Sequence, residues 1–207
     1  RSRQLDQQVR LIAKSLAGRR DLHVQQQLIS QLAGELERPL SPALNSQLLL
    51  SSSSHSVNAT DNERIIAAFA AVLSDWPHCD SGTRDNWAAG LARTRKQARS
   101  LARRACNSDQ DALFHRCRKW TKYYLYQLEQ LHDSRLPASS EMQTLARLGE
   151  QLGQLQDLCN LEAQLQTLAP DQESEALAER LEKRKGHCKR RIIRLFIKVY
   201  GRRHLDV

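Results

Sequence analysis

Apolar side chains recur along much of the chain every three or four residues, which is the period of an amphipathic α-helix. Residues 4–37 carry the first such pattern, and Pro39 ends it. A shorter apolar pattern covers 64–72. Two further patterns, over 84–106 and 109–132, interleave apolar positions with many basic ones. These four stretches predict helices.

Residues 141–168, rich in Leu and Gln, predict another helix, and 172–200 predicts one helix or two that meet at Gly186. Residues 40–60 are rich in Ser and polar residues, so we expect a loop there. No alternating strand pattern of useful length is visible. The predicted fold class is therefore all-α, and long amphipathic helices favour antiparallel helical bundles.

An internal repeat divides the chain. Residues 16–22 (LAGRRDL) line up with residues 152–158 (LGQLQDL), and each copy has a carboxylate at its sixth position, Asp21 and Asp157. Both copies lie within long predicted helices with similar flanks. We therefore expect two related helical halves, residues 1–107 and 108–207, which together make one domain.

Charge is segregated along the sequence. The net charge is +9 overall. Residues 84–122 hold eleven Lys/Arg against three Asp/Glu, and residues 183–203 hold ten Lys/Arg and no acid, so the remainder of the chain is acidic. Such segregation builds a local positive potential, which points to an anionic partner.

The cations of these two segments recur at helical spacing, so each set shares one side of its helix. The candidate binding residues are Arg93, Lys96, Arg99 and Arg103; His115, Arg118, Lys119 and Lys122; and His187, Arg190, Arg191 and Arg194. Guanidinium and ammonium groups suit phosphate because they make charge-assisted hydrogen bonds. The alternative for each set is an ordinary solvated face. His115 has three open roles: a phosphate donor, a pH-sensitive charge or a packed helix contact.

The sequence also argues against a membrane protein, a disulfide-bonded protein and a metalloprotein. No apolar run is long enough to cross a bilayer, so no membrane partner is expected. Five widely spread cysteines without a C-x-x-C pair favour a reducing cytosol. His78 and Cys79 lack partners at metal-ligand spacing, and we expect no metal or other cofactor.

Catalysis finds little support, because the sequence has no P-loop, no G-x-S-x-G and no H-E-x-x-H. We therefore expect no enzyme activity. Trp120, Tyr123 and Tyr124 are candidates for stacking on nucleobases, but the spacing of Trp120 and Tyr124 favours places in the core.

Three segments together resemble the CHAD family, a helical domain named for its histidines. Residues 90–99 (GLARTRKQAR) resemble its Gly-Leu-x-Arg-x-Tyr-Arg-x-x-Arg helix. Residues 115–122 (HRCRKWTK) resemble its His-x-x-Arg-Lys-x-x-Lys motif. The segments that end near Asp21 and Asp157 resemble its Leu-Gly-x-x-x-Asp repeat.

The resemblance implies two four-helix bundles related by pseudo-twofold symmetry, with a basic groove between them that binds inorganic polyphosphate. It also implies a first helix before Arg1, which is missing from this sequence. Arg95 stands where the family has Tyr, His23 where it has a second Asp, and Ala17 where it has Gly. The missing helix bears on whether the basic cavity is complete.

Asp21 and Asp157 are unsuited to bind a polyanion directly, since they carry the same sign of charge. We expect structural roles, in which each carboxylate pairs with a His or Arg of a neighbouring helix. Removal of one partner of a buried pair of this kind costs about 3–5 kcal/mol.

The sequence thus predicts a cytoplasmic, non-catalytic module that binds inorganic polyphosphate along a basic groove, and by resemblance it is also a candidate for polyphosphate granules. A first alternative is the accessory half of a CYTH-type triphosphatase whose catalytic domain lies outside this chain. The Glu-x-Glu-x-Lys signature of that catalytic domain is absent here. A second alternative is an RNA- or DNA-binding helical protein, and a third is a protein-interaction bundle.

Overall fold

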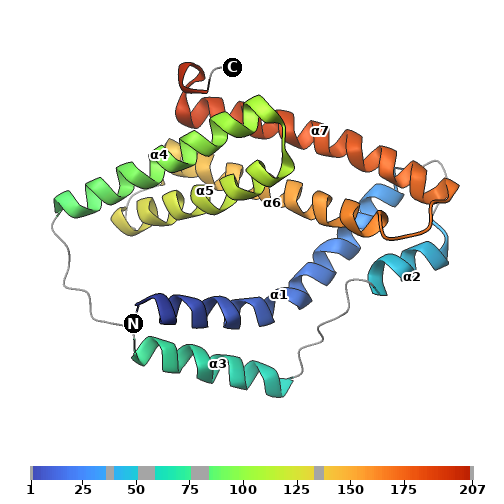
Figure 1. The fold of residues 1–207 in the computed structure, drawn as a ribbon, viewed down its shortest axis with the longest axis horizontal. Coiled ribbons are helices and arrows are strands. Elements are labelled where there is room, and N and C mark those ends of the chain that lie inside the picture. Colours follow the sequence, from blue (N-terminus) through green and yellow to red (C-terminus); the bar gives the residue numbers. More distant parts are fainter. Residues whose placement is uncertain (1, 36–39, 51–58, 76–83, 133–137, 206–207) are drawn as a thin grey trace. The chain divides into compact units, whose positions relative to one another are not determined.

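The computed structural model describes residues 2–35, 40–50, 59–75, 84–132 and 138–205 (Figure 1). In these ranges the chain is all-α, as predicted, and contains no strand. The helices are α1 (Ser2–Ala33), α2 (Pro42–Leu50), α3 (Ala59–Ser74), α4 (Arg84–Ser108), α5 (Asp111–Leu131), α6 (Ser140–Leu165) and α7 (Gln172–Tyr200). A 3₁₀ turn, η1 (Arg202–His204), follows α7.

Apolar periodicity located α4 to α7 within a few residues of their observed ends. α7 is one continuous helix, so the alternative of two helices that meet at Gly186 is wrong. The short pattern over 64–72 extends in both directions to form α3.

The loop expected over 40–60 contains α2, so that prediction was wrong. Ser41 caps this helix, because its hydroxyl accepts a hydrogen bond from the backbone N–H of Leu44 at 3.3 Å. Pro42 stands at the first helical position, where its missing N–H costs nothing. Leu44 and Leu48, four residues apart, are both buried, and their burial holds the short helix in place.

The chain forms two compact units. Unit 1 comprises residues 1–81 and 163–180, and unit 2 comprises residues 82–162 and 181–207. Packing defines these units, whereas sequence repetition defined the expected halves 1–107 and 108–207. The pseudo-symmetric division into those halves stays a prediction.

In unit 1, α1 packs against both α2 and α3. Its described core is aliphatic and includes Ile29, Leu32 and Leu48. Glu173 accepts a hydrogen bond from the backbone N–H of Ser41 at 3.1 Å, which joins the start of α2 to the start of α7. A second polar contact, 2.9 Å between Arg180 and Glu35, joins α7 to the end of α1.

Unit 2 contains α4, α5, α6 as far as Glu162, and α7 from Leu181 onward. α4 and α5 run side by side as an antiparallel hairpin (Figure 1). α6 contributes a row of buried leucines at helical spacing, and α7 contributes Ile192 and Phe196. The Phe196 ring stacks on Phe114 of α5, with ring centroids 6.4 Å apart.

The turn between α4 and α5 consists of two residues, and Asp109 adopts a left-handed conformation there with φ of 52°. Residues other than Gly avoid this region, although Asp and Asn tolerate it better than most. Its N–H still bonds to the carbonyl of Ala105 at 3.1 Å, so Asp109 closes α4. α5 then begins at Asp111, whose charge suits a helix N-terminus.

Lys189 of α7 holds this turn. Its ammonium group lies 3.2 Å from the Asp109 carboxylate and 2.9 Å from the Asp111 carboxylate. It also donates a hydrogen bond to the backbone carbonyl of Asp109 at 3.1 Å. The same ammonium group lies 5.7 Å from the centre of the Phe114 ring, a cation–π distance.

Lys185, one helical turn earlier, completes the interior ion cluster. Its side chain is only 5% exposed, and its ammonium group lies 2.8 Å from Glu162, 3.0 Å from Asp111 and 3.3 Å from Glu182. We call Lys185 and Lys189 the interior lysines. Through them α7 is attached both to α6 and to the turn that joins α4 and α5.

Replacement of Lys185 by Ala should lower the free energy of unfolding, because it leaves the Glu162 carboxylate without its lysine partner and leaves Asp111 paired with Lys189 alone. We expect a loss of about 2–3 kcal/mol, less than the roughly 3–5 kcal/mol of a fully buried pair. The reduction reflects the exposure of these carboxylates, which is 33% for Asp111 and 30% for Glu162. Urea unfolding followed by circular dichroism measures the change.

Lys198→Ala is the matched control, since Lys198 is an exposed lysine on the same helix. It should change the free energy of unfolding by no more than about 0.5 kcal/mol. Equal losses in the two variants would show that the interior position of Lys185 contributes nothing.

Candidate polyanion-binding surface

The central basic helix, α5, is built as an amphipathic helix. Its buried residues are Leu113, Phe114, Cys117, Thr121, Tyr124 and Leu125. The opposite side carries what we call the α5 outer face: His115, Arg116, Lys119, Lys122, Tyr123 and Tyr126. Burial of one side in the core of unit 2 therefore fixes the direction in which the other side points.

Three of the four predicted binding residues of α5 lie on this outer face. His115 and Lys119 are exposed and Lys122 is half-buried. Of the three roles open to His115, a packed helix contact is therefore wrong. Tyr124 is buried, as its spacing predicted, and Trp120 is half-buried.

Arg118, the fourth predicted residue of α5, turns toward α6. A Cβ atom added at Gly153 would lie 3.5 Å from its Nε and 3.7 Å from one terminal nitrogen, so the guanidinium packs beside the α6 backbone. Its Nε is buried and donates no hydrogen bond within the described part of the chain. A buried N–H without an acceptor is costly, and an anion beside Arg118 would satisfy it.

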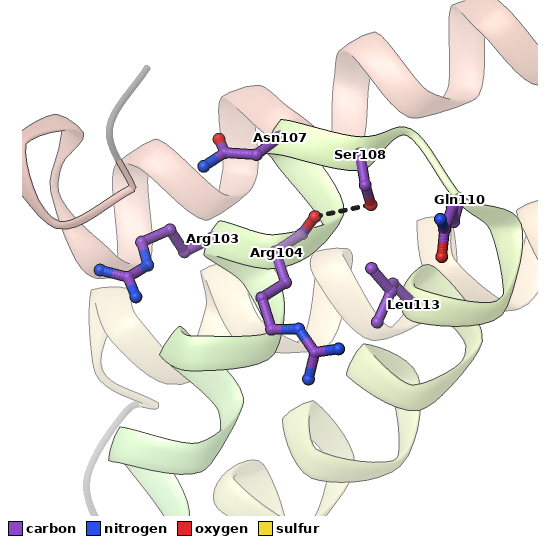
Figure 2. Close-up of a pocket in the computed structure, with 6 residues that line it drawn as sticks. All are labelled: Arg103, Arg104, Asn107, Ser108, Gln110 and Leu113. Carbon is purple, nitrogen blue, oxygen red and sulfur yellow. Dashed lines mark hydrogen bonds between the residues drawn. The ribbon is translucent and has the colours of Figure 1, made fainter.

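The predicted cations of α4 lie on its solvent side. Arg93, Lys96 and Arg103 are exposed, and Arg99 is half-buried. Arg103 also lines an open pocket of about 470 Å³ at the turn between α4 and α5, which Figure 2 shows. The other lining residues are Arg104, Asn107, Ser108, Gln110 and Leu113.

This pocket is not a two-arginine clamp. In Figure 2 the guanidinium groups of Arg103 and Arg104 point in different directions. The Ser108 hydroxyl donates a hydrogen bond to the Arg104 carbonyl at 2.8 Å, so its proton is engaged in the helix end. The pocket offers separate contacts for an anionic chain that passes over it, and no enclosed site for a single phosphate.

The predicted residues of α7 are all exposed: His187, Arg190, Arg191 and Arg194. A Cβ atom added at Gly186 would lie 3.5 Å from a terminal nitrogen of Arg190, so that side chain folds back along its own helix. Ile192 and Phe196, on the opposite side, are fully buried.

The structure thus assigns all twelve predicted binding residues to unit 2, on α4, α5 and α7. A single groove shared by the three sets stays a prediction. Arg104 and Arg116 are exposed cations that the sequence reasoning did not select. Both are next in sequence to selected residues, Arg103 and His115. They were not selected because they do not fit the i, i+3, i+4 spacing of the chosen cations.

The sequence reasoning also missed the interior lysines. Lys185 and Lys189 were counted with the ten cations of residues 183–203, yet both side chains are buried and paired. Their spacing contained the signal, because positions 185, 189, 192 and 196 lie on one side of a helix with Ile192 and Phe196. A sum of charges cannot distinguish cations that point inward from those that point outward.

The two predicted structural carboxylates have different outcomes. The side chain of Asp21 lies outside the described residues. Asp157 is half-buried and is engaged with another residue. The pairing of each with a His or Arg of a neighbouring helix stays a prediction.

Metal-binding groups and membrane-crossing helices are both absent from the described ranges. Within them, no group of three or more His, Cys, Asp or Glu side chains is arranged to hold a metal ion. None of the helices there combines the length and the apolar character needed to cross a membrane.

The interior lysines shift the pKa of their partners. Burial raises the pKa of Asp111, but the hydrogen bonds and charges of Lys189 and Lys185 outweigh burial and hold that pKa below its usual 3.8. Burial lowers the pKa of Lys185, but Glu162 and Asp111 outweigh it and hold the pKa above its usual 10.5. Asp111 and Lys185 are therefore both charged at neutral pH.

These observations define an all-helical protein with a strongly cationic second unit. Among protein families, the CHAD domain matches residues 1–166. The chain belongs to the CHAD domain family, and the whole of α7 lies beyond the matched residues. Comparisons with curated proteins and with solved structures found no match.

The stability of unit 2 should fall when the pH drops below about 4. A carboxyl group whose folded pKa lies below its unfolded value of 3.8 stabilises the fold above that pH, and the contribution disappears as the pH falls through the folded pKa. Wild type and Asp111→Asn should therefore differ in urea midpoint at pH 6, and the difference should narrow below pH 4. A difference that stays constant down to pH 2.5 would contradict the ion pairs of Asp111.

Proposed function

We propose that this chain is a helical module that binds inorganic polyphosphate through the outward cations of unit 2. The proposal assigns no reaction to the chain, in keeping with a sequence that has none of the catalytic signatures named above. The observation on which it rests is the surplus of outward positive charge in one compact unit.

The charge of the chain divides unequally between the units. Unit 2 contains 23 Lys/Arg and 11 Asp/Glu, a net charge of +12, whereas unit 1 contains nine Lys/Arg and 12 Asp/Glu, a net charge of −3. A compact body with this surplus attracts polyanions over a Debye length of about 8 Å at physiological ionic strength. Polyphosphate is a linear polyanion, so separate cations along the unit can each add to its binding.

Part of the acidic charge of unit 2 is held by the interior lysines. Four of its carboxylates, Asp109, Asp111, Glu162 and Glu182, lie within 3.3 Å of Lys185 or Lys189. Asp111 and Glu162, 33% and 30% exposed, are held toward the interior by these pairs, whereas Asp109 and Glu182 stay mostly exposed. The pairing inside the unit supports an outer surface that is more cationic than the sequence total suggests.

Arg118 adds a specific donor. Its buried Nε has no acceptor in the described part of the chain, and its guanidinium sits beside α6 while Lys122 follows one turn later on α5. Arginine can bind phosphate in bidentate fashion, and such charge-assisted bonds are about twice as strong as neutral ones. Arg118 is the residue we expect to contribute most specificity for phosphate.

Removal of the cations of α5 should weaken polyphosphate binding. The variant Arg118→Gln/Lys119→Gln/Lys122→Gln should raise the Kd for polyphosphate of about 100 units by at least tenfold at 150 mM salt. The slope of log K against log salt should become shallower by about 0.7 for each phosphate that the protein no longer neutralises. Isothermal titration at several salt concentrations measures both quantities, and circular dichroism confirms an unchanged helical content.

The variant Arg147→Gln/Lys198→Gln serves as the control. It removes two exposed cations of the same unit that are not among the predicted binding residues, Arg147 on α6 and Lys198 on α7. We expect its salt slope to match that of the wild type. If both variants lose affinity in proportion to the charge removed, binding depends on net charge alone. An unchanged Kd in the α5 variant would place the site on α4 or α7.

A further inference from the structure

Two tyrosines on the α5 outer face are exposed without a reason in the packing of unit 2. Tyr123 is 40% exposed and Tyr126 is 51% exposed, whereas Tyr124 and Tyr200 are buried in the core. Single exposed apolar residues need no explanation. Here the two rings lie three residues apart on one helix, so they are neighbours on its surface.

Each tyrosine follows a lysine by four residues, Lys119 before Tyr123 and Lys122 before Tyr126. Residues four apart lie one above the other on a helix, so the face alternates cation and ring twice. The Lys119 ammonium lies 5.5 Å from the centre of the Tyr123 ring. Arg116 and His115, both exposed, extend the positive charge along the same face.

The Tyr123 ring is also held from the side. Trp120 contacts it edge to face, with ring centroids 5.8 Å apart and an angle of 77° between the planes. Trp120 is half-buried, so it joins the exposed ring to the body of the helix. A ring fixed in this way loses little conformational freedom when a ligand stacks on it.

Polyphosphate does not account for this pattern, since it has no planar group to place on a tyrosine. A single-stranded nucleic acid has both required parts: phosphates for the lysines and unpaired bases for the rings. In a duplex the bases are stacked and paired inside the helix, so they offer the tyrosine rings no free face on which to stack. A protein partner fits less well, because lysine is depleted where protein interfaces are buried, and here lysine alternates with the rings.

We propose that the α5 outer face binds single-stranded nucleic acid, with bases stacked on Tyr123 and Tyr126 and phosphates at Lys119, Lys122 and Arg116. This role shares Lys119 and Lys122 with the proposed polyphosphate binding, but it also depends on the two tyrosine rings, which polyphosphate binding does not need. The site takes bases of any type, since every base has a face that stacks.

The test compares Tyr123→Ala/Tyr126→Ala with the wild type in two assays. One measures the Kd for a fluorescently labelled 12-nucleotide oligo-uridine and the other the Kd for labelled polyphosphate, each at 100 mM salt. Loss of a stacked base weakens binding of single strands substantially. We expect the Kd for oligo-uridine to rise by roughly tenfold or more and the Kd for polyphosphate to stay within twofold.

Two matched variants separate the ring from the fold. Tyr126→Phe keeps the aromatic surface and should retain oligo-uridine affinity. Trp87→Ala removes another exposed aromatic of unit 2, 46% exposed on α4, and should also leave the affinity unchanged. If the double alanine variant loses helical content, Tyr123→Leu/Tyr126→Leu keeps the apolar bulk and takes its place.

The outcomes distinguish the two proposals. A rise in Kd limited to oligo-uridine supports the inference, and weak binding of duplex RNA supports it further. Equal losses for both ligands, equal affinity for duplex and single strand, or no oligo-uridine binding by the wild type would overturn it. In the last case polyphosphate binding would stand alone. Tyrosine-dependent binding of oligo-uridine without polyphosphate binding would overturn the proposed function and leave the inference standing.

Discussion

The packing of unit 2 depends on the ion pairs that Lys185 and Lys189 make inside it. Lys189 holds both the side chain and the backbone carbonyl of Asp109, the residue with φ of 52° at the tight turn between α4 and α5. A left-handed Asp persists only where its surroundings support it. Lys189 supplies that support from α7, 80 positions later in the sequence.

A buried ion pair seldom contributes much net stability, because the removal of two charges from water is costly. In unit 2 part of that cost is offset. Asp111 stands at the N-terminus of α5, where the helix dipole favours its charge, and Lys189 lies over the Phe114 ring. The pairs contribute structural specificity. Apolar contacts alone would tolerate a shift of α7 along its neighbours, whereas each lysine pairs only with particular carboxylates. They set the register of α7 against α6 and against the α4–α5 turn.

Much of the fold could be predicted from the sequence because its helices share one pattern, the recurrence of apolar residues every three or four positions. Apolar spacing identified α4 to α7 and the all-α class, since each helix buries one side and exposes the other. α2 was missed because its signals are local, namely a Ser41 cap, Pro42 and the buried Leu44 and Leu48, in a stretch whose composition resembles a loop. The apolar period carries no information on which distant residues pair, so the contact between Arg180 and Glu35 could not be predicted from it.

The sequence indicated which residues are candidates for the site, but it did not indicate where their side chains point. Charge counting selected α4, α5 and α7, and every chosen cation of α4 and α7 reaches solvent at least in part. It counted Lys185 and Lys189 with the surface cations because a charge total carries no orientation. It also grouped Arg118 with Lys119, although Arg118 packs beside Gly153 of α6 while Lys119 lies over Tyr123 of its own helix. A helical wheel places side chains on faces, but only the neighbouring helices decide which long side chains fold back.

Lysine thus serves two opposite ends in unit 2, and the difference lies in position alone. On the inner side of α7 it contacts carboxylates, and on the outer face of α5 the Lys119 ammonium lies over the exposed Tyr123 ring. The inner pairs hold Asp111 and Glu162 partly inside the unit, where their negative charge is matched by lysine. Loss of an interior lysine would therefore affect the proposed polyanion binding in two ways, by loosening α7 and by releasing carboxylates toward the outer cations. The proposed polyanion binding and the stability of this unit would then be linked through the carboxylates that the interior lysines pair with.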